Sequence, residues 1–181
     1  MRADARRNRA RVLAAAEAVF QEAGAAATTE QIARRAGVGI GTVFRHFPTK
    51  SDLLHAIITD SLERLTVRVT ELESHGDPAT AFYDFFTELV RQAGEKHGVM
   101  ALLAQTGEAP AVHKPIDAWR ATVERLLARA QAAGAVRPDV GGDDVLALLL
   151  GLCQTAVTTG WDDTRCRAVL RVVFDGLAAR H

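Results

Sequence analysis

A chain of 181 residues with 48% apolar content can bury a hydrophobic core, but it has no apolar run long enough to cross a bilayer, and its N-terminus, MRADARRNRARV, lacks the apolar stretch of a signal peptide. The two cysteines, Cys153 and Cys166, fit neither a disulfide framework nor a metal site, so we expect a cytoplasmic protein with no metal, no cofactor and no membrane partner. The formal net charge is zero, yet residues 1–50 carry nine Lys or Arg against four acidic residues, so a basic part of +5 precedes an acidic remainder, which suits a protein that meets a polyanion at one end.

Nearly every segment has its apolar residues at helical spacing, and none shows the alternation of a half-buried strand. We therefore expect an all-α fold. The first helix is predicted from about Ala5 to Ala23, with Gly24 ending it. A second, short helix opens at Thr28, which has the spacing of a capping box with Gln31, and it closes at Gly37.

A third short helix is predicted to end at the Phe47-Pro48 pair, because the residue before a proline avoids helical backbone angles. The fourth helix is long, from about Lys50 to Leu72, and either Thr49 or Ser51 can cap it. Five further helices are expected near residues 79–95, 98–105, 114–133, 143–159 and 163–179. The pattern predicts about nine helices: an N-terminal three-helix bundle, joined by the long helix to a larger helical domain.

Residues 28–47 contain a capped helix, a turn built on Gly37 and Gly39, and a second short helix, which is the layout of a helix-turn-helix. Val43 and Phe47 are expected to face inward. The exposed side and the leading end of the second helix, where such a helix meets the major groove, then hold Ile40, Gly41, Thr42, Phe44, Arg45 and His46.

The stretch TTEQIARRAGVGIGTVFRHFPTKSDLL resembles the DNA-binding signature of TetR/AcrR-family regulators: a Thr-opened helix, I-A-x-x-A-G-V, and a G-T-x-aromatic-x-H-F-x-x-K-x-x-L block. The resemblance covers roughly residues 6–60, whereas the later helices resemble the family only in number, length and order. It implies a ligand-responsive transcriptional regulator, by family default a repressor and not an enzyme. Residues 1–50 would bind a palindromic operator, and residues 51–181 would bind a ligand and dimerise.

By this resemblance, Thr29, His46 and Lys50 would hold phosphates of double-stranded DNA, and Arg45 would contact a base edge. The chain departs from the commonest family pattern at Phe44, where tyrosine is frequent, and at Gly39, where a serine often caps the recognition helix. The complete set of DNA-binding candidates is Thr28, Thr29, Gly39, Ile40, Gly41, Thr42, Phe44, Arg45, His46 and Lys50.

The segment DDVLALLLGLCQTAVTT, residues 143–159, is apolar nearly all round, and a small monomer has little core in which to bury every face of such a helix. We expect it to pair with the last helix and with the same two helices of a second copy, although both could instead be internal core. The residues expected at this homodimer interface are Val145, Leu148, Leu149, Leu152, Val169, Val172 and Val173.

Large apolar residues on the remaining helices could line a cavity for an apolar or aromatic small-molecule effector, and a packed core would look the same. The residues expected to line this pocket are Phe82, Phe85, Phe86, Met100, Leu103, His113, Trp119, Val123 and Cys153.

Two other classes of protein compete with a regulator. An enzyme has little support, since the chain has no phosphate-binding glycine loop, no G-x-S-x-G elbow and no histidine pair at metal-binding spacing. A helical small-molecule-binding or interaction protein without sequence-specific DNA binding stays open, because Phe44 and Gly39 depart from the family pattern.

Overall fold

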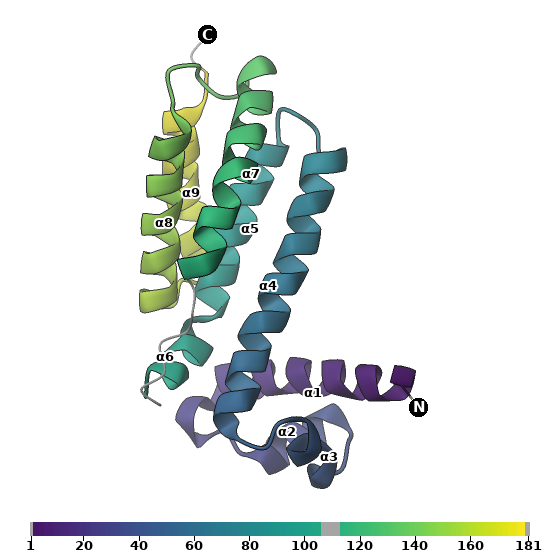
Figure 1. Cartoon of the computed structure of the whole chain (residues 1–181). Helices are drawn as coiled ribbons and strands as arrows, with labels where there is room; N and C mark the ends of the chain where they lie inside the picture. The colour runs from purple at the N-terminus through teal and green to yellow at the C-terminus, as the bar shows by residue number, and fades with distance from the viewer. Residues whose placement is uncertain (1, 106–112, 180–181) are drawn as a thin grey trace. The chain divides into compact units, whose positions relative to one another are not determined.

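The computed structural model describes the backbone of residues 2–105 and 113–179 and, within them, the side chains of all residues except 2–3 and 113–118. These residues form nine α-helices and no strand (Figure 1), which confirms the expected all-α fold. The backbones of Val136 and Ala178 make one isolated antiparallel bridge. None of the helices in the described part of the chain is both long enough and apolar enough to span a membrane.

The helices divide between two compact units, with the division falling inside α4 after Glu63 and again at Gly98. The first unit contains α1 (Arg2–Ala23), the short 3-10 helix η1 (Gly24–Ala26), α2 (Thr29–Ala36), α3 (Ile40–His46), the first half of α4 (Lys50–His75) and most of α6 (His97–Gln105). The second contains the rest of α4, α5 (Ala81–Glu95), α7 (His113–Ala132), α8 (Gly142–Thr159) and α9 (Asp163–Leu177). The functional division expected at residue 50 stays a prediction, because packing units do not test it.

The first unit is held by one apolar core to which each of its α-helices contributes. The inward face of α1 supplies Leu13 and Phe20, α3 supplies Val43, and α4 supplies Leu54, all of them buried. Leu103 of α6 belongs to the same core. Burying a side chain of this size contributes about 1.5–3 kcal/mol, so this core fixes how α2 and α3 sit on α1.

Short-range interactions in the first unit form where the sequence predicts them. Thr28 Oγ1 accepts the N–H of Gln31 at 3.3 Å, and Gln31 Oε1 accepts the N–H of Thr28 at 2.9 Å, which is the expected capping box. Gly37 ends α2 in the left-handed region, with φ +63°. Of the two residues able to cap α4, Thr49 does so, because its Oγ1 accepts the N–H of Asp52 at 3.0 Å.

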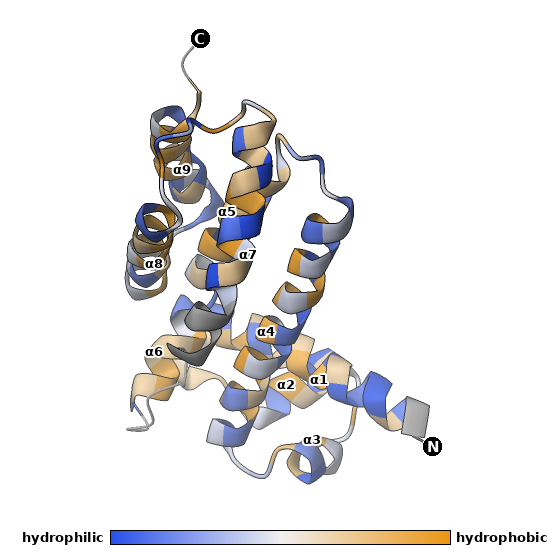
Figure 2. Cartoon of the chain, turned by 45° about the horizontal axis from the view of Figure 1, so that its top comes forward, coloured by the Kyte–Doolittle hydropathy of each residue, from blue (hydrophilic) through white to orange (hydrophobic). Residues whose placement is uncertain are grey.

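The second unit is built around α5, which packs against α7, α8 and α9 (Figure 1). Its three phenylalanines, Phe82, Phe85 and Phe86, are fully buried. Phe86 meets Phe174 of α9 edge-on at 5.7 Å between ring centroids, a preferred arrangement for aromatic pairs. The apolar residues of α5, α7 and α8 appear as orange stretches along these helices in Figure 2.

The observed helix limits differ from the predicted ones by at most three residues. The largest differences are at the start of α1 and at the end of α4. The first helix begins at Arg2 and the fourth runs to His75, both three residues beyond expectation. The end of α4 is stabilised by Arg129 of α7, whose guanidinium donates to the carbonyls of Glu73 and Gly76 at 2.6 Å each. The last carbonyls of a helix have no partner within it, so a cation from another helix stabilises the end of α4 beyond its predicted limit.

Candidate DNA-binding surface

The short helix α3 and its C-cap Phe47 turn two side chains inward and present others to solvent. Val43 and Phe47 are buried in the core of the first unit, whereas Ile40 and Phe44 are 40% and 49% exposed. Arg45 is also exposed. Two large apolar side chains at (i, i+4) spacing on the surface of a small helix are an arrangement that favours contact with another molecule.

Three of the predicted phosphate-binding and groove-facing residues come together around one shallow depression. Thr29 from the start of α2, Phe44 from α3 and Lys50 from the start of α4 all line it. Two further lining residues, Ile32 and Val43, are buried core residues. The helix-turn-helix therefore gathers on one surface groups that are far apart in the sequence.

The Lys50 ammonium is already engaged in this structure. Its Nζ donates to the carbonyl oxygen of Ala25 at 3.1 Å and lies 5.4 Å from the centre of the Phe20 ring. An ammonium group has three N–H donors, so the carbonyl contact orients the charge and leaves donors for a phosphate oxygen. Lys50 is thus held at the edge of the depression by groups from α1 and η1.

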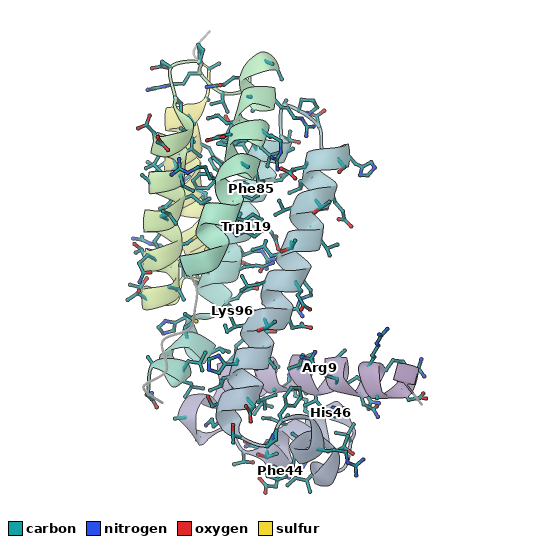
Figure 3. The ribbon with its side chains drawn as sticks, in the orientation of Figure 1. Arg9, Phe44, His46, Phe85, Lys96 and Trp119 are labelled. Atoms are coloured by element: carbon teal, nitrogen blue, oxygen red, sulfur yellow. The ribbon has the colours of Figure 1, made fainter. Side chains whose placement is uncertain are left out.

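His46 and Gly39, at the two ends of α3, differ in what they offer. The His46 ring is half-buried, with its centroid 6.1 Å from that of Phe47 (Figure 3). Gly39 is the N-cap of α3 and makes no side-chain cap hydrogen bond, so the departure from serine leaves that end uncapped. A Cβ at Gly41 would meet no atom within 4 Å, so the surface there is open. Thr42 is half-buried and Thr28 is exposed, its hydroxyl engaged in the capping box.

Sequence reasoning missed two arginines of α1 that touch this region. The guanidinium of Arg9 lies 5.7 Å from the centre of the Phe47 ring (Figure 3). Arg11 donates to the carbonyl oxygens of Ala36 and Gly37, the latter at 3.1 Å. The predicted break after α2 would have pointed to Arg11, because carbonyls at the end of a helix attract a cation.

Comparisons with known proteins agree with this geometry. Residues 12–57 match the family model described as bacterial regulatory proteins, tetR family, and residues 77–179 match the model described as transcriptional regulator SbtR-like, C-terminal domain. Together the two models span most of the chain. The chain belongs to the TetR family. It is accordingly a DNA-binding transcriptional regulator with an N-terminal DNA-binding part and a C-terminal part of the ligand-binding type.

Two solved TetR-family structures and one curated relative illustrate the likeness. The structure of the TetR transcription regulatory protein from Mycobacterium vanbaalenii is 39% identical, with a TM-score of 0.77 over 98% of this chain and 99% of that one. A TetR transcriptional regulator from Streptomyces coelicolor is 31% identical, with a TM-score of 0.74 over 96% and 99%. The HTH-type transcriptional regulator UidR of Escherichia coli K12 is 29% identical over 84% of this chain and 81% of its own length.

The residues expected at the TetR-type dimer interface fall into three groups. Val145 and Leu149 of α8 are buried in the core of the chain itself. Leu148 is 43% exposed and Val172 of α9 is 71% exposed. The other three, Leu152, Val169 and Val173, are half-buried. Of the expected interface residues, Leu148 and Val172 thus have the most side-chain surface left to bury.

The residues expected to line the effector pocket also separate. Phe82, Phe85, Phe86 and Val123 are buried in the core of the second unit, and Trp119 and Cys153 pack against it. Leu103 instead belongs to the core of the first unit, and Met100, half-buried on α6, lies in that unit as well. The side chain of His113 lies outside the described residues.

Burial raises the pKa of two polar side chains, Tyr83 and Cys153, that pack against the second core. The Tyr83 hydroxyl donates to the carbonyl oxygen of Ala135 at 2.9 Å, and burial raises its pKa. Burial, with a smaller contribution from nearby Cys166, raises the pKa of Cys153 to about 12. Both thiols are free, as expected of packed cysteines. In the part of the chain that the structure describes, no group of three or more His, Cys, Asp or Glu side chains could hold a metal ion.

Proposed function

We propose that this TetR-family regulator is a repressor that binds a palindromic operator as a homodimer and leaves it when a small apolar or aromatic molecule binds the second unit. The observation that carries the DNA-binding part is α3: Val43 and Phe47 anchor it, while Ile40, Phe44 and Arg45 stay exposed. A helix anchored on one face and accessible on the other can enter a major groove without any unfolding.

Within this proposal, Arg45 reads a base edge and Lys50, Thr29 and His46 hold phosphates. A guanidinium can donate to both acceptors of guanine in the major groove, and one such bidentate pair is worth about 1–3 kcal/mol of discrimination. Thr29 occupies the first turn of α2, where backbone N–H groups and the helix dipole favour an anion. Lys50 lines the same depression, so one phosphate could be held from two helices.

The test is fluorescence polarisation with labelled DNA from upstream of the gene, measured at two salt concentrations against an unrelated duplex. Specific binding that weakens steeply with salt is expected of a regulator. Arg45→Ala should cost about 1–3 kcal/mol and relax specificity at one base pair of each half-site. Equal affinity for both duplexes at both salt concentrations would favour the alternative, a helical binding protein without sequence-specific DNA binding.

The dimer is proposed to form through the exposed apolar residues of α8 and α9. Twofold symmetry would then set two copies of α3 about one helical turn of DNA apart or slightly more. Val172→Glu should place a charge in the interface and shift sedimentation velocity toward the monomer. Val67→Glu is the matched control, because Val67 is 61% exposed on α4 and lies outside the proposed interface. A Val172→Glu protein that remains as dimeric as the Val67→Glu protein would contradict this assignment.

The effector is proposed to be apolar or aromatic because the second core is lined by aromatic side chains, among them Phe85 of α5 and Trp119 of α7, whose ring centroids are 5.8 Å apart (Figure 3). A ligand releases DNA only if it binds the released conformation more tightly than the bound one. Operator affinity measured across a library of apolar and aromatic metabolites should fall with at least one of them. Operator affinity that no member of such a library changes would count against ligand control.

A further inference from the structure

The first turns of α1 carry arginines on the face that further along the helix is buried. Leu13, Ala16 and Phe20 follow one another at three- and four-residue spacing and are buried against α2, α3 and α4. Continuing that spacing toward the N-terminus reaches Arg9 and then Arg6, both of which are exposed. The inward stripe of α1 thus changes from apolar to cationic where the core ends.

This part of α1 extends beyond the core. The first buried side chain of the helix among those described is Val12, and Arg6 lies six residues before it, which is roughly 9 Å along the helix axis. The blue N-terminal turns of α1 in Figure 2 are this hydrophilic extension. It also precedes the TetR-family match, which begins at residue 12.

The extension lies beside the recognition helix. Arg9 sits over the ring of Phe47, the residue that directly follows α3, and the Phe47 ring neighbours that of His46. Arg9 is therefore positioned at the C-terminal end of α3, next to a residue proposed to hold a phosphate. Arg11 does not share this face, because its guanidinium is bonded to the end of α2.

We propose that Arg6 and Arg9 form a second contact with the DNA backbone, in which the cationic start of the α1 stripe holds phosphates adjacent to those held by His46. This inference rests on the proposed operator binding and adds to it a site outside the helix-turn-helix. The face of α1 that carries Arg6 and Arg9 is exposed and cationic. It is therefore complementary in charge to a DNA backbone that passes α3. Arginine guanidinium groups pair with phosphate oxygens through short, charge-assisted hydrogen bonds.

The experiment uses the full chain and a duplex that the wild-type chain enriches from a random library. Affinity is measured over a range of salt concentrations, since removing one cation that neutralises a phosphate lowers the steepness of log K against log salt by about 0.9. In a dimer each arginine counts twice, so Arg6→Ala should lower this slope by about 1.8 and the Arg6→Ala/Arg9→Ala variant by about twice that amount. Hydroxyl-radical footprinting of these variants should show weaker protection of the DNA backbone next to the bases that α3 contacts in each half-site.

Three controls separate this contact from general effects. Arg167→Ala removes the same charge from an exposed position of α9 that does not share a face with Val169 and Val172, and it should leave slope and footprint unchanged. The Arg6→Lys/Arg9→Lys variant keeps the charges and should retain the wild-type slope. The single variant Arg6→Ala tests the contact without disturbing α3, because Arg9 touches Phe47 and its removal could loosen that helix.

The outcomes distinguish the two proposals. If the wild-type chain enriches no duplex, the proposed function fails and this inference fails with it. If a duplex is enriched and the Arg6→Ala/Arg9→Ala variant keeps the wild-type slope and footprint, only the α1 contact is overturned. A lysine variant with the slope of the alanine variant would also overturn it, because a phosphate contact needs the charge.

Discussion

Replacing Gly37 by alanine should destabilise the first unit, whereas the same replacement at Gly41 should not. Gly37 ends α2 with φ +63° and ψ 40°, and a side chain there would place its Cβ 2.7 Å from a guanidinium nitrogen of Arg11. Gly41 lies inside α3, where a Cβ would meet no atom within 4 Å. The two substitutions are chemically identical and differ only in backbone conformation and surroundings.

The expected size of the Gly37→Ala effect follows from these two differences. The left-handed conformation costs a residue with a Cβ about 1–2 kcal/mol. Displacing Arg11 weakens its hydrogen bonds to the carbonyls of Ala36 and Gly37, each worth about 1 kcal/mol, although the flexible end of the side chain can move aside. The free energy of unfolding should fall by about 1–3 kcal/mol in all. Gly41→Ala should raise it by about 0.5–1 kcal/mol, since alanine has less conformational freedom to lose in a helix.

Urea unfolding followed by circular dichroism measures both changes, and the Arg11→Ala background separates the backbone strain from the side-chain clash. Without the guanidinium, Gly37→Ala should cost only the backbone strain, so the double-mutant cycle should show a coupling of the order of 1 kcal/mol. Gly37→Asn should be milder than Gly37→Ala, because asparagine tolerates the left-handed region. A Gly37→Ala protein as stable as the wild type, or two glycine positions that respond alike, would refute the reasoning.

Three further predictions address the DNA-binding surface and the second core. Phe44→Tyr should tighten operator binding roughly three- to tenfold in a polarisation assay, because the exposed ring can carry a hydroxyl to a phosphate. Unchanged affinity would contradict the placement of this ring beside a phosphate. Burial raises the pKa of Glu88, but hydrogen bonds from Gln92 and Arg91 outweigh it and hold that pKa below its ordinary value. The carboxylate therefore stabilises the fold above the unfolded pKa and loses this effect as pH falls through the folded pKa, so Glu88→Gln should unfold more easily than the wild type at pH 7 and equally easily in acid. With the pKa of Cys153 at about 12, its folded thiol should react with Ellman's reagent at pH 8 far more slowly than in urea, and equal rates would contradict its burial.

The helix-turn-helix could be predicted residue by residue because local chemistry determines it. The Thr28–Gln31 capping box, the left-handed Gly37 and the Phe47-Pro48 stop each involve residues within a few positions of one another. Such features need no knowledge of the rest of the fold. By contrast, the extension of α4 to His75 depends on Arg129, a residue more than fifty positions away.

Assigning the apolar residues of the later helices needs the tertiary structure. Helix α8 is apolar nearly all round, so its pattern does not distinguish Val145 and Leu149, which face the core of the chain, from Leu148, which is exposed. The same ambiguity makes Leu103 a pocket candidate from sequence, although it packs with α1 and α4. Hydrophobic periodicity predicts that a side chain is buried, but only the tertiary structure shows which residues bury it.

The number of cations can be counted in the sequence, but only the tertiary structure shows which of them are free to contact DNA. The sequence counts nine cations in residues 1–50, but the structure shows several of them engaged within the protein. Arg35 holds the Glu22 carboxylate with contacts of 2.6 and 2.7 Å, Arg7 pairs with Asp4, and Arg11 binds main-chain carbonyls. Counterion release depends on cations that reach phosphates, so each subunit should release fewer than nine counterions on binding. In the proposed complex, Arg6, Arg9, Arg45 and Lys50 are the cations assigned to contact DNA, so their positions, rather than the net charge, should decide the path of the DNA.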